Sequence, residues 1–465
     1  MQELLDVNQF HFDIQGITEH LHTNRTRLES LRTQKRALEK WRLGRNQLHE
    51  NTLLSRAEVS RRQLERLSTL VDFVFAHTAF YHKLYHAAGY QSGDITTWGD
   101  YHALPTITKT DVVDNFDLLT KHLLGDEANR YSSRTAGSSG QVMTILRDQA
   151  LADHHTSLYL RFYEQMLGRE RNPAEWLYEI YLAPPPYTSL MGHYPVFTVS
   201  QDCPPAAVLQ HIHILKPSIL WSFPSYLLRT IDLFGEDLGS LGLEAICTHS
   251  EGSTKGERRR IADAFGAPVF DEYGSEELCL IATECRLGRY HIVEDNVRVD
   301  VLNPNEDGSG EIVATGFMNS FMPFIRYRHG DIIRIEPEND SCVCGNNFRT
   351  LGAFLGRSDQ LLTRKNGEIV PPDRVMGLYD RTLITSNARV LEFRIEQESA
   401  DLVNLFVQPE PEFRSSNDVY QEFLLGLREL FGDPSPELRT HVVDSMPKSL
   451  SYKRRLITNK LWTTS

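Results

Sequence analysis

Apolar residues recur at helical or heptad spacing in the first part of the chain. From about residue 15 to residue 85 the sequence is rich in Leu, Arg, Glu and Gln and has few helix breakers. The spaced apolar positions are Leu28, Leu31 and Leu38, followed by Leu64, Leu67, Leu70 and Val71. This pattern predicts long amphipathic helices. The charged stretch at residues 25–45 fits a helix that binds a membrane surface or a partner, but a solvated helix of alternating charge is favoured.

From Tyr101 onward the pattern changes to short apolar runs that alternate with helical segments. The runs ILWSF (219–223), LEAICTHS (243–250) and APVFDEYG (267–274) are strand-like, and a helical segment, TKGERRRIADAF, lies between the second and the third. A strand, a helix and a strand in this order are what a parallel sheet requires. The middle of the chain is therefore predicted to be of the α/β class.

The last third has a different pattern. Alternation in GEIVATGF and FIRYRHGDIIRIE, between residues 308 and 336, predicts strands of an antiparallel, barrel-like region. Strands are expected near 393–408 and a helix at 417–431. We thus expect an α/β fold with a helical N-terminal region (1–100) attached to a large core domain (101–356). That core combines mixed or parallel sheets flanked by helices with the barrel-like subdomain. A small, mobile α+β domain (357–465) follows.

Bulk properties narrow the class of protein. A length of 465 residues predicts two or more domains, and a formal charge of −13 argues against a nucleic-acid partner. The N-terminus lacks the pattern of a signal peptide, and no apolar run is long enough to span a bilayer. Six cysteines are too few for a disulfide scaffold. A cytoplasmic protein without a membrane partner is expected.

Two polar segments have the composition of phosphate or metal sites. In YSSRTAGSSGQ (131–141), small residues around Gly137 and Gly140 would let backbone amides approach phosphate oxygens, although a surface turn explains the same letters. DEYGSEE (271–277) follows an apolar run, so it falls at the carboxyl edge of the sheet, where ligands bind in open α/β folds. A carboxylate there suits Mg²⁺, and a charged loop is the alternative.

Three further segments are weaker evidence for a functional site when each is taken alone. FIRYRHGD (324–331) ends in an acidic residue that suits ribose hydroxyls, or else is a surface turn. GRSD (356–359) is a polar turn where a hinge between domains belongs. PKSLSYKRR (447–455) carries cations that suit a phosphate, or else form a solvated tail.

Read in order, these segments resemble the successive core motifs of the adenylate-forming superfamily, which contains acyl-CoA synthetases, nonribosomal peptide adenylation domains and luciferases. The resemblance runs from about Leu64 to Lys460. It is nearest to the phenylacetate–CoA ligase and capsule-biosynthesis ligase branch. The segments that carry this are FYHKLYHAAGY with LPTITKTDV, LKPSILWSFPSYL, THSEG and GEIVATGFMNSFMPFIRYRHGD.

The resemblance implies a role for each matching residue. The phosphate loop would run over Thr135, Ala136, Gly137, Ser138, Ser139 and Gly140. The adenine and acyl groups would lie along Ser250, Glu251 and Gly252 and beside Tyr273, Gly274 and Ser275. Glu277 would bind Mg²⁺. Asp331 would hold the ribose with Arg357 nearby, Asp359 would be the hinge and Lys453 the catalytic lysine. Trp221, Phe223 and Tyr226 fit an aryl pocket, but equally a hydrophobic core.

The sequence departs from the family pattern at three positions. Gln141 stands where the phosphate loop has a lysine, which removes a cation near the pyrophosphate. Glu276 replaces the threonine before Glu277, and a second carboxylate beside phosphates is repulsive unless it points away or helps to bind metal. Tyr452 replaces the glycine before Lys453. These changes leave the rate and the acceptor open.

Four further residues have the composition of a structural zinc site. Cys285 and His291 lie in ECRLGRYH, and Cys342 and Cys344 lie in CVCG. Three thiolates and one imidazole complete a tetrahedral zinc set, and some members of the resembled branch carry a similar cluster. Unconnected cysteines with a surface histidine are the alternative, and zinc is favoured.

The resemblance implies ATP, Mg²⁺ and a small carboxylic acid as ligands, with acyl-AMP and pyrophosphate as the first products. Transfer to CoA, with an aryl or arylacetic acid, is the favoured second step. Transfer to the thiol of a separate carrier protein or to an amine is the alternative, and a non-catalytic nucleotide-binding scaffold is a distant third. The leucine-bearing N-terminal helices suit a homodimer, and the sequence leaves the oligomeric state open.

Overall fold

The fold is that of a computed structural model. It describes residues 31–120, 130–135, 143–182, 185, 187–337, 342–357, 361–370, 372–384, 390–413, 418–446 and 456–462. Among these residues, no helix is long and apolar enough to cross a membrane.

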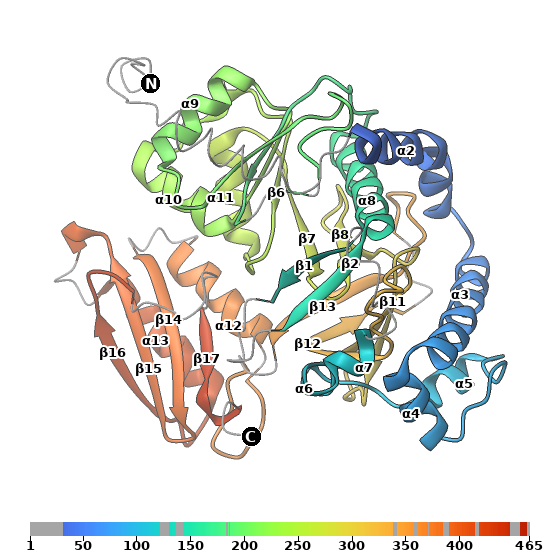
Figure 1. The fold of residues 1–465 in the computed structure, drawn as a ribbon. Coiled ribbons are helices and arrows are strands. Elements are labelled where there is room, and N and C mark those ends of the chain that lie inside the picture. Colours follow the sequence, from blue (N-terminus) through green and yellow to red (C-terminus); the bar gives the residue numbers. More distant parts are fainter. Residues whose placement is uncertain are drawn as a thin grey trace.

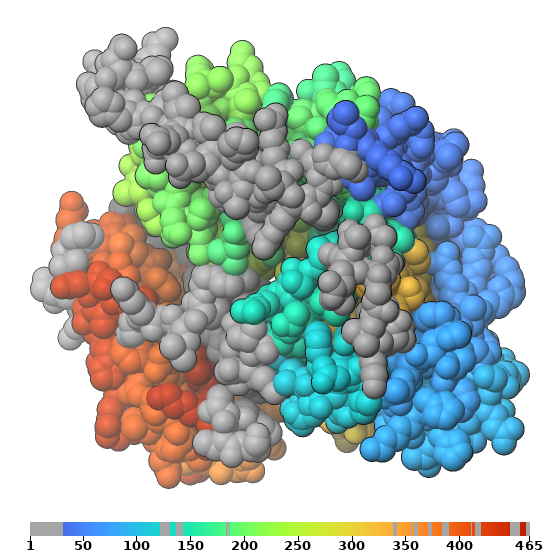
Figure 2. All heavy atoms as spheres, viewed as in Figure 1, coloured from blue at the N-terminus to red at the C-terminus, as the bar shows by residue number. Residues whose placement is uncertain are grey.

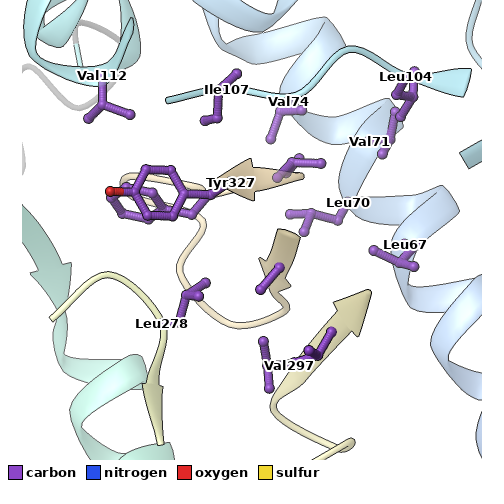
Figure 3. Packing of buried hydrophobic residues seen from close by; sticks show 14 of the residues in the cluster. Leu67, Leu70, Val71, Val74, Leu104, Ile107, Val112, Leu278, Val297 and Tyr327 are labelled. Carbon is purple, nitrogen blue, oxygen red and sulfur yellow. The ribbon is translucent and has the colours of Figure 1, made fainter. Parts of the chain in front are cut away.

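The N-terminal helices pack against the core through one apolar side. Their bounds are α2 (Leu31–Asn51), α3 (Arg56–His77), α4 (Ala79–Ala87), α5 (Trp98–Ala103), α6 (Lys109–Asp114) and α7 (Phe116–Thr120). Leu67, Leu70, Val71 and Val74 of α3 are buried in one cluster with Val297 and Tyr327 (Figure 3). The predicted long helices are confirmed from residue 31 onward, and residues 15–30 lie outside the described part. The buried side of α3 shows that its leucines serve the core.

One mixed sheet of 11 strands organises the large part of the molecule (Figure 1). Its order is β10-β11-β12-β13-β9-β8-β7-β6-β5-β3-β4. Strands β3 (Leu177–Ile180), β4 (Val196–Val199), β5 (Ile219–Ser222), β6 (Ala245–Thr248) and β7 (Val269–Ser275) pair in parallel. The others are antiparallel: β8 (Cys279–Glu284), β9 (Tyr290–Ile292), β10 (Val297–Leu302), β11 (Ser309–Gly316), β12 (Tyr327–Ile335) and β13 (Thr350–Arg357). The strands predicted as a barrel-like region are thus antiparallel members of this same sheet.

Helices cover both faces of the parallel strands. Leu220 and Ile246 pack into a cluster with residues of α9 (Pro205–Leu215), α10 (Pro224–Phe234) and α11 (Lys255–Phe265). Ile219, Trp221 and Cys247 point to the other face, into a cluster with residues of α8 (Gln149–Leu167). Burial on both faces explains why these strands read as continuous apolar runs. Figure 1 shows α8 apart from the other three helices.

Two smaller units complete the fold. A hairpin of β1 (Arg130–Arg134) and β2 (Thr144–Asp148) stands next to the sheet. The C-terminal unit (described residues from 361 to 462) has a separate sheet ordered β16-β15-β14-β17. Its elements are α12 (Pro372–Tyr379), the π-helical turn Asp380–Ile384, β14 (Val390–Ser399), β15 (Leu402–Pro409), α13 (Asp418–Phe431), β16 (Glu437–Val442) and β17 (Ile457–Asn459). It has a hydrophobic core of its own, and Figure 2 shows it as an orange and red mass at one side.

Candidate functional site

The candidate site forms where β7 and β12 approach each other. The Tyr273 hydroxyl donates a hydrogen bond to Oδ2 of Asp331 at 2.5 Å, and the same oxygen lies 2.6 Å from Nδ1 of His329. His329 and Asp331 alternate along β12, so both side chains project from one face of the strand. Tyr273 comes from the end of β7, where a register shift follows it. The motifs DEYGSEE and FIRYRHGD are thus brought together.

Charge is concentrated at this point. Burial by itself would favour neutral Asp331, but His329 and then Arg357 outweigh it and lower the pKa of this carboxyl. Arg357, from β13, places a guanidinium nitrogen 3.7 Å from Oδ1 of Asp331. Burial also opposes a charged His329, yet Asp331 and then Glu277 raise the pKa of the imidazole. Asp331 is therefore held as a carboxylate, the form that accepts hydrogen bonds from hydroxyl groups.

Glu277 lies at the same place, in the turn between β7 and β8. Its Oε1 accepts a hydrogen bond from the Tyr327 hydroxyl at 3.1 Å, and its Oε2 lies 4.0 Å from Nε2 of His329. Lys109, the first residue of α6, also interacts with it: burial lowers the pKa of Lys109, and the Glu277 carboxylate partly opposes that shift. The carboxylate fits a hard cation such as Mg²⁺, which oxygen ligands hold.

Gly274 is fixed by close packing. A Cβ at this position would come within 2.7 Å of the backbone carbonyl oxygen of Cys279. A side chain here would therefore push β7 and β8 apart. The Ser275 hydroxyl accepts a hydrogen bond from the Leu278 amide at 3.2 Å, which closes the turn that carries Glu276 and Glu277.

The segment 250–252 lies at the same edge of the sheet. Thr248, at the end of β6, pairs with Asp271 of β7, so both strands present their carboxyl ends together. Ser250 has a φ of +63°, a left-handed conformation that non-glycine residues rarely adopt. The Glu251 carboxylate accepts a hydrogen bond from the backbone amide of Ser225 at 3.3 Å. Ligands of open α/β sheets bind at such an edge.

The hairpin of β1 and β2 carries Thr135, the first residue of the predicted phosphate loop. The Thr135 amide donates to the Met143 carbonyl at 2.9 Å, and the Thr135 hydroxyl accepts from the Met143 amide at 3.0 Å. Residues 136–142 join these two positions in the sequence and lie outside the described residues. The same holds for Asp359, Tyr452 and Lys453. The roles given to Ala136, Gly137, Ser138, Ser139, Gly140, Asp359 and Lys453 therefore stay predictions.

The three aromatic residues assigned to an acyl pocket are buried in the core. Trp221 packs edge-on against Tyr159 at a ring-centre distance of 5.2 Å. Phe223 and Tyr226 belong to the cluster around α9, α10 and α11, and the Tyr226 hydroxyl donates to the Cys203 carbonyl at 2.6 Å. Burial of this kind fits both alternatives that the sequence left open, so the aryl pocket stays a prediction.

The four predicted zinc ligands are brought together from three segments. The ligand atoms of Cys285, His291, Cys342 and Cys344 all lie within 4.8 Å of one another. The Cys285 and Cys342 sulfurs are 3.9 Å apart, and the Cys344 sulfur lies 3.3 Å from Nε2 of His291. Nδ1 of His291 lies 3.0 Å from the Phe348 carbonyl, which leaves Nε2 turned towards the thiols. Burial lowers the pKa of His291 and so favours the neutral imidazole that a metal requires.

Comparisons with known proteins bear on the family and on the fold. No family model matches the chain. Over 339 residues it is 26% identical to the phenylacetate-coenzyme A ligase of Aromatoleum evansii, covering 68% of this chain and 74% of the relative. Among solved structures, 2-hydroxyisobutyryl-CoA ligase in the postadenylation state with R3-HIB-AMP superimposes with a TM-score of 0.74 at 19% identity, covering 88% of this chain and 92% of that one.

The sequence likeness to the ligase and the shared fold both support the adenylate-forming superfamily. The predicted superfamily, its phenylacetate–CoA ligase branch and the α/β fold class are therefore confirmed. The same 2-hydroxyisobutyryl-CoA ligase in its thioesterification state gives a TM-score of 0.59 at 18% identity, over 88% of this chain and 91% of that one. The fold of this chain therefore matches the postadenylation arrangement of that ligase better than its thioesterification arrangement.

Three residues at the candidate site were not singled out from the sequence. His329 and Tyr327 lie inside the motif FIRYRHGD, and their alternation with Asp331 on a strand was the available signal. Lys109 lies in LPTITKTDV, which was used only to identify the branch. Its place near Glu277 depends on a bridge between Ile107 and Tyr327, which no sequence pattern reports.

Proposed function

We propose that this protein activates a carboxylic acid with ATP, forms an acyl-adenylate and pyrophosphate, and then transfers the acyl group to CoA. It would thus be an AMP-forming acid–thiol ligase. The favoured acids are aryl or arylacetic acids, because the relative reported above is a phenylacetate–coenzyme A ligase. Transfer to a carrier-protein thiol or to an amine is the alternative.

The observation that carries this proposal is the convergence of Tyr273, Asp331 and Glu277 at the carboxyl edge of the sheet, beside the hairpin that leads into the phosphate loop. In the proposed complex, Asp331 accepts hydrogen bonds from the ribose hydroxyls, with Arg357 beside it. Tyr273 and Gly274 flank the adenine and acyl groups, and residues 250–252 line the same pocket. Glu277 holds Mg²⁺ against the triphosphate.

Adenylation requires the protein mainly to align the acid with ATP and to neutralise negative charge. The acid's carboxylate oxygen attacks the α-phosphorus in line and pyrophosphate leaves, so the protein has to align the two groups and neutralise negative charge. Lys453 is proposed to bring a cation to the reacting oxygens from the C-terminal domain (357–465). Rotation about Asp359 would then withdraw Lys453 and open the site to the thiol.

The Cys285, His291, Cys342 and Cys344 cluster is proposed to hold a structural zinc ion. Three sulfurs and one imidazole nitrogen are a donor set that Zn²⁺ prefers. Tetrahedral ligation at a Zn–S distance of about 2.3 Å places two sulfurs about 3.8 Å apart, close to the 3.9 Å between Cys285 and Cys342. Such a site would tie the β8–β9 turn to the segment before β13.

The test is exchange of labelled pyrophosphate into ATP with a panel of aryl, arylacetic, fatty and amino acids, with Lys453→Ala as the control. Exchange with one acid, lost in the control, is the expected result and names the substrate class. Loss of the free CoA thiol as the acyl-CoA thioester forms, or formation of an amide with an added amine, then distinguishes a CoA acceptor from an amine acceptor. Folded protein that binds ATP but exchanges with no acid of the panel would contradict the proposal and favour a nucleotide-binding scaffold.

A further inference from the structure

Arg147 connects the hairpin of β1 and β2 to the glutamate turn (residues 275–278). It lies on β2 opposite Tyr131 of β1. One terminal guanidinium nitrogen donates to the backbone carbonyl of Glu276 and, at 2.6 Å, to the Glu276 carboxylate. The Arg147 side chain is 13% exposed and that of Glu276 is 32% exposed, so the pair is largely shielded from water.

This pairing explains how Glu276 is accommodated. Glu276 precedes Glu277, and two adjacent carboxylates beside a triphosphate would repel it. The structure directs the Glu276 carboxylate to Arg147, whereas the Glu277 carboxylate faces Tyr327 and His329. The two neighbouring acids thus have separate partners, and Glu276 carries little net charge towards the site.

Glu276 is also the main counter-ion of Arg147. Within the described part of the chain, it is the only carboxylate within ion-pair distance of that guanidinium. The Nε of Arg147 is buried and has no hydrogen-bond partner among the described residues. Burial lowers the pKa of nearby His155, and the Arg147 cation lowers it further, so this neighbour stays neutral. In a variant without the Arg147 charge, Glu276 would have no other cation within ion-pair distance among the described residues.

The contact also fixes a spatial relationship. Next to Arg147, the Leu146 carbonyl accepts a hydrogen bond from the Asn319 side chain at 3.2 Å. On the other side, Asp148 caps helix α8 through the Leu151 amide at 2.8 Å. The base of the hairpin is therefore held at three successive residues, and only the middle one reaches the turn that carries Glu277.

We propose that Arg147 is a positioning residue for ATP. It neutralises Glu276, so that this carboxylate does not repel the triphosphate that the hairpin and the glutamate turn are proposed to hold. This inference rests on the proposed function, because it assumes that ATP binds between these segments.

The experiment measures the dissociation constant of MgATP by calorimetry, without any acid, for wild type, Arg147→Met, Glu276→Thr and the double variant. We expect Arg147→Met to weaken binding about tenfold, because an uncompensated carboxylate then faces the triphosphate; tenfold corresponds to about 1.4 kcal/mol. Glu276→Thr should bind within about threefold of wild type. The double variant should recover to a similar value, because the repelling carboxylate is gone.

A purely structural tether predicts a different result, since the double variant would then bind as weakly as Arg147→Met. That outcome, or unchanged binding in Arg147→Met, overturns the inference. Arg169→Met is the matched control, because Arg169 also pairs with a carboxylate, that of Glu244, on an exposed part of the surface. Should Arg147→Met fail to fold, Arg147→Lys keeps the charge and should bind within about threefold of wild type; a tenfold loss there would overturn the charge role.

The two proposals fail separately. Wild-type protein that binds no MgATP would overturn both the proposed function and this inference. Wild-type protein that binds MgATP, with Arg147→Met equal to it, overturns only the role of Arg147. Absence of exchange with every acid, with the expected pattern of MgATP binding, contradicts the ligase proposal and leaves Arg147 as a nucleotide-positioning residue.

Discussion

The hydroxyl of Tyr379, at the end of α12, donates a hydrogen bond to Oε1 of Glu257 in the first turn of α11 at 3.0 Å. Oε2 of the same carboxylate accepts from the Thr254 amide at 2.9 Å and so caps α11. Beside it, the Asp380 carboxylate accepts from the Gly256 amide at 3.2 Å. The C-terminal unit thus docks on the large part of the molecule at a helix N-terminus, where negative charge is stabilised.

Loss of the Tyr379 hydroxyl is expected to slow adenylation. In Tyr379→Phe the ring keeps its packing on Phe393, but one interdomain hydrogen bond, worth about 0.5–1.5 kcal/mol, is removed. The pyrophosphate-exchange rate should fall about twofold to tenfold, whereas thioester formation from added acyl-adenylate should not fall. Arg381→Gln is the control, because among the described residues that exposed side chain donates its hydrogen bond to the Gly377 carbonyl of its own helical segment. Equal loss in both half-reactions would contradict a role in this docked arrangement.

The cysteine cluster is expected to bind one zinc ion per chain. Cys342→Ser and Cys344→Ser should each lose the metal and lower the melting temperature by about 5–10 °C, since a loss of a few kcal/mol shifts a large domain by that amount. Metal content by mass spectrometry and thermal unfolding test this. Cys203→Ser, a cysteine outside the cluster, should keep both properties. Metal-free wild-type protein with unchanged stability in the variants would rule out a structural zinc.

The pair of His329 and Asp331 predicts a pH-dependent stability. The pKa of His329 is raised in the folded protein. The protonated imidazole therefore stabilises the fold fully below the unfolded pKa of about 6.5, and this stabilisation is lost as the pH rises through the folded pKa. His329→Gln should therefore destabilise the protein more at pH 6, by about 1.5–3 kcal/mol, than at pH 9. Urea unfolding at the two pH values measures this. A cost that grows towards pH 9 would contradict a charged imidazole.

The pKa of Asp331 is lowered, so its contribution has the opposite pH dependence. It is present above the unfolded pKa of about 3.9 and is lost as the pH falls through the folded pKa. Asp331→Asn should cost more stability at pH 6 than at pH 3, and MgATP binding should weaken with it at neutral pH. Calorimetry and urea unfolding of the same preparation check both effects.

Two glycine substitutions should have opposite effects. Gly274→Ala places a Cβ 2.7 Å from a backbone oxygen and should destabilise by about 1–3 kcal/mol. Gly44→Ala, in the interior of α2, meets no atom within 4 Å and should stabilise by about 0.5–1 kcal/mol. Thermal unfolding of the two variants is the measurement. A neutral Gly274→Ala would mean that β7 and β8 can separate at the site.

Local pattern determined much of this protein. The runs at 219–223 and 243–250 became β5 and β6, and the segment after Thr254 became α11, because apolar periodicity and a capping threonine act over a few residues. Strands near 393–408 and a helix ending at Phe431 were confirmed in the same way. The motifs indicated the superfamily, because each can be recognised from its own residues and all of them occur in the expected order along the chain.

Tertiary structure decided which of these segments meet. The sequence does not indicate that Arg147 compensates Glu276, since 129 residues separate them and either charge alone reads as a solvated side chain. Nor does it establish that Phe223 and Tyr226 are buried, because burial depends on α9 to α11 packing over them. Local propensity fixes the elements, and the long-range contacts that place His329 beside Asp331, or Tyr379 on Glu257, exist only once the sheet has formed.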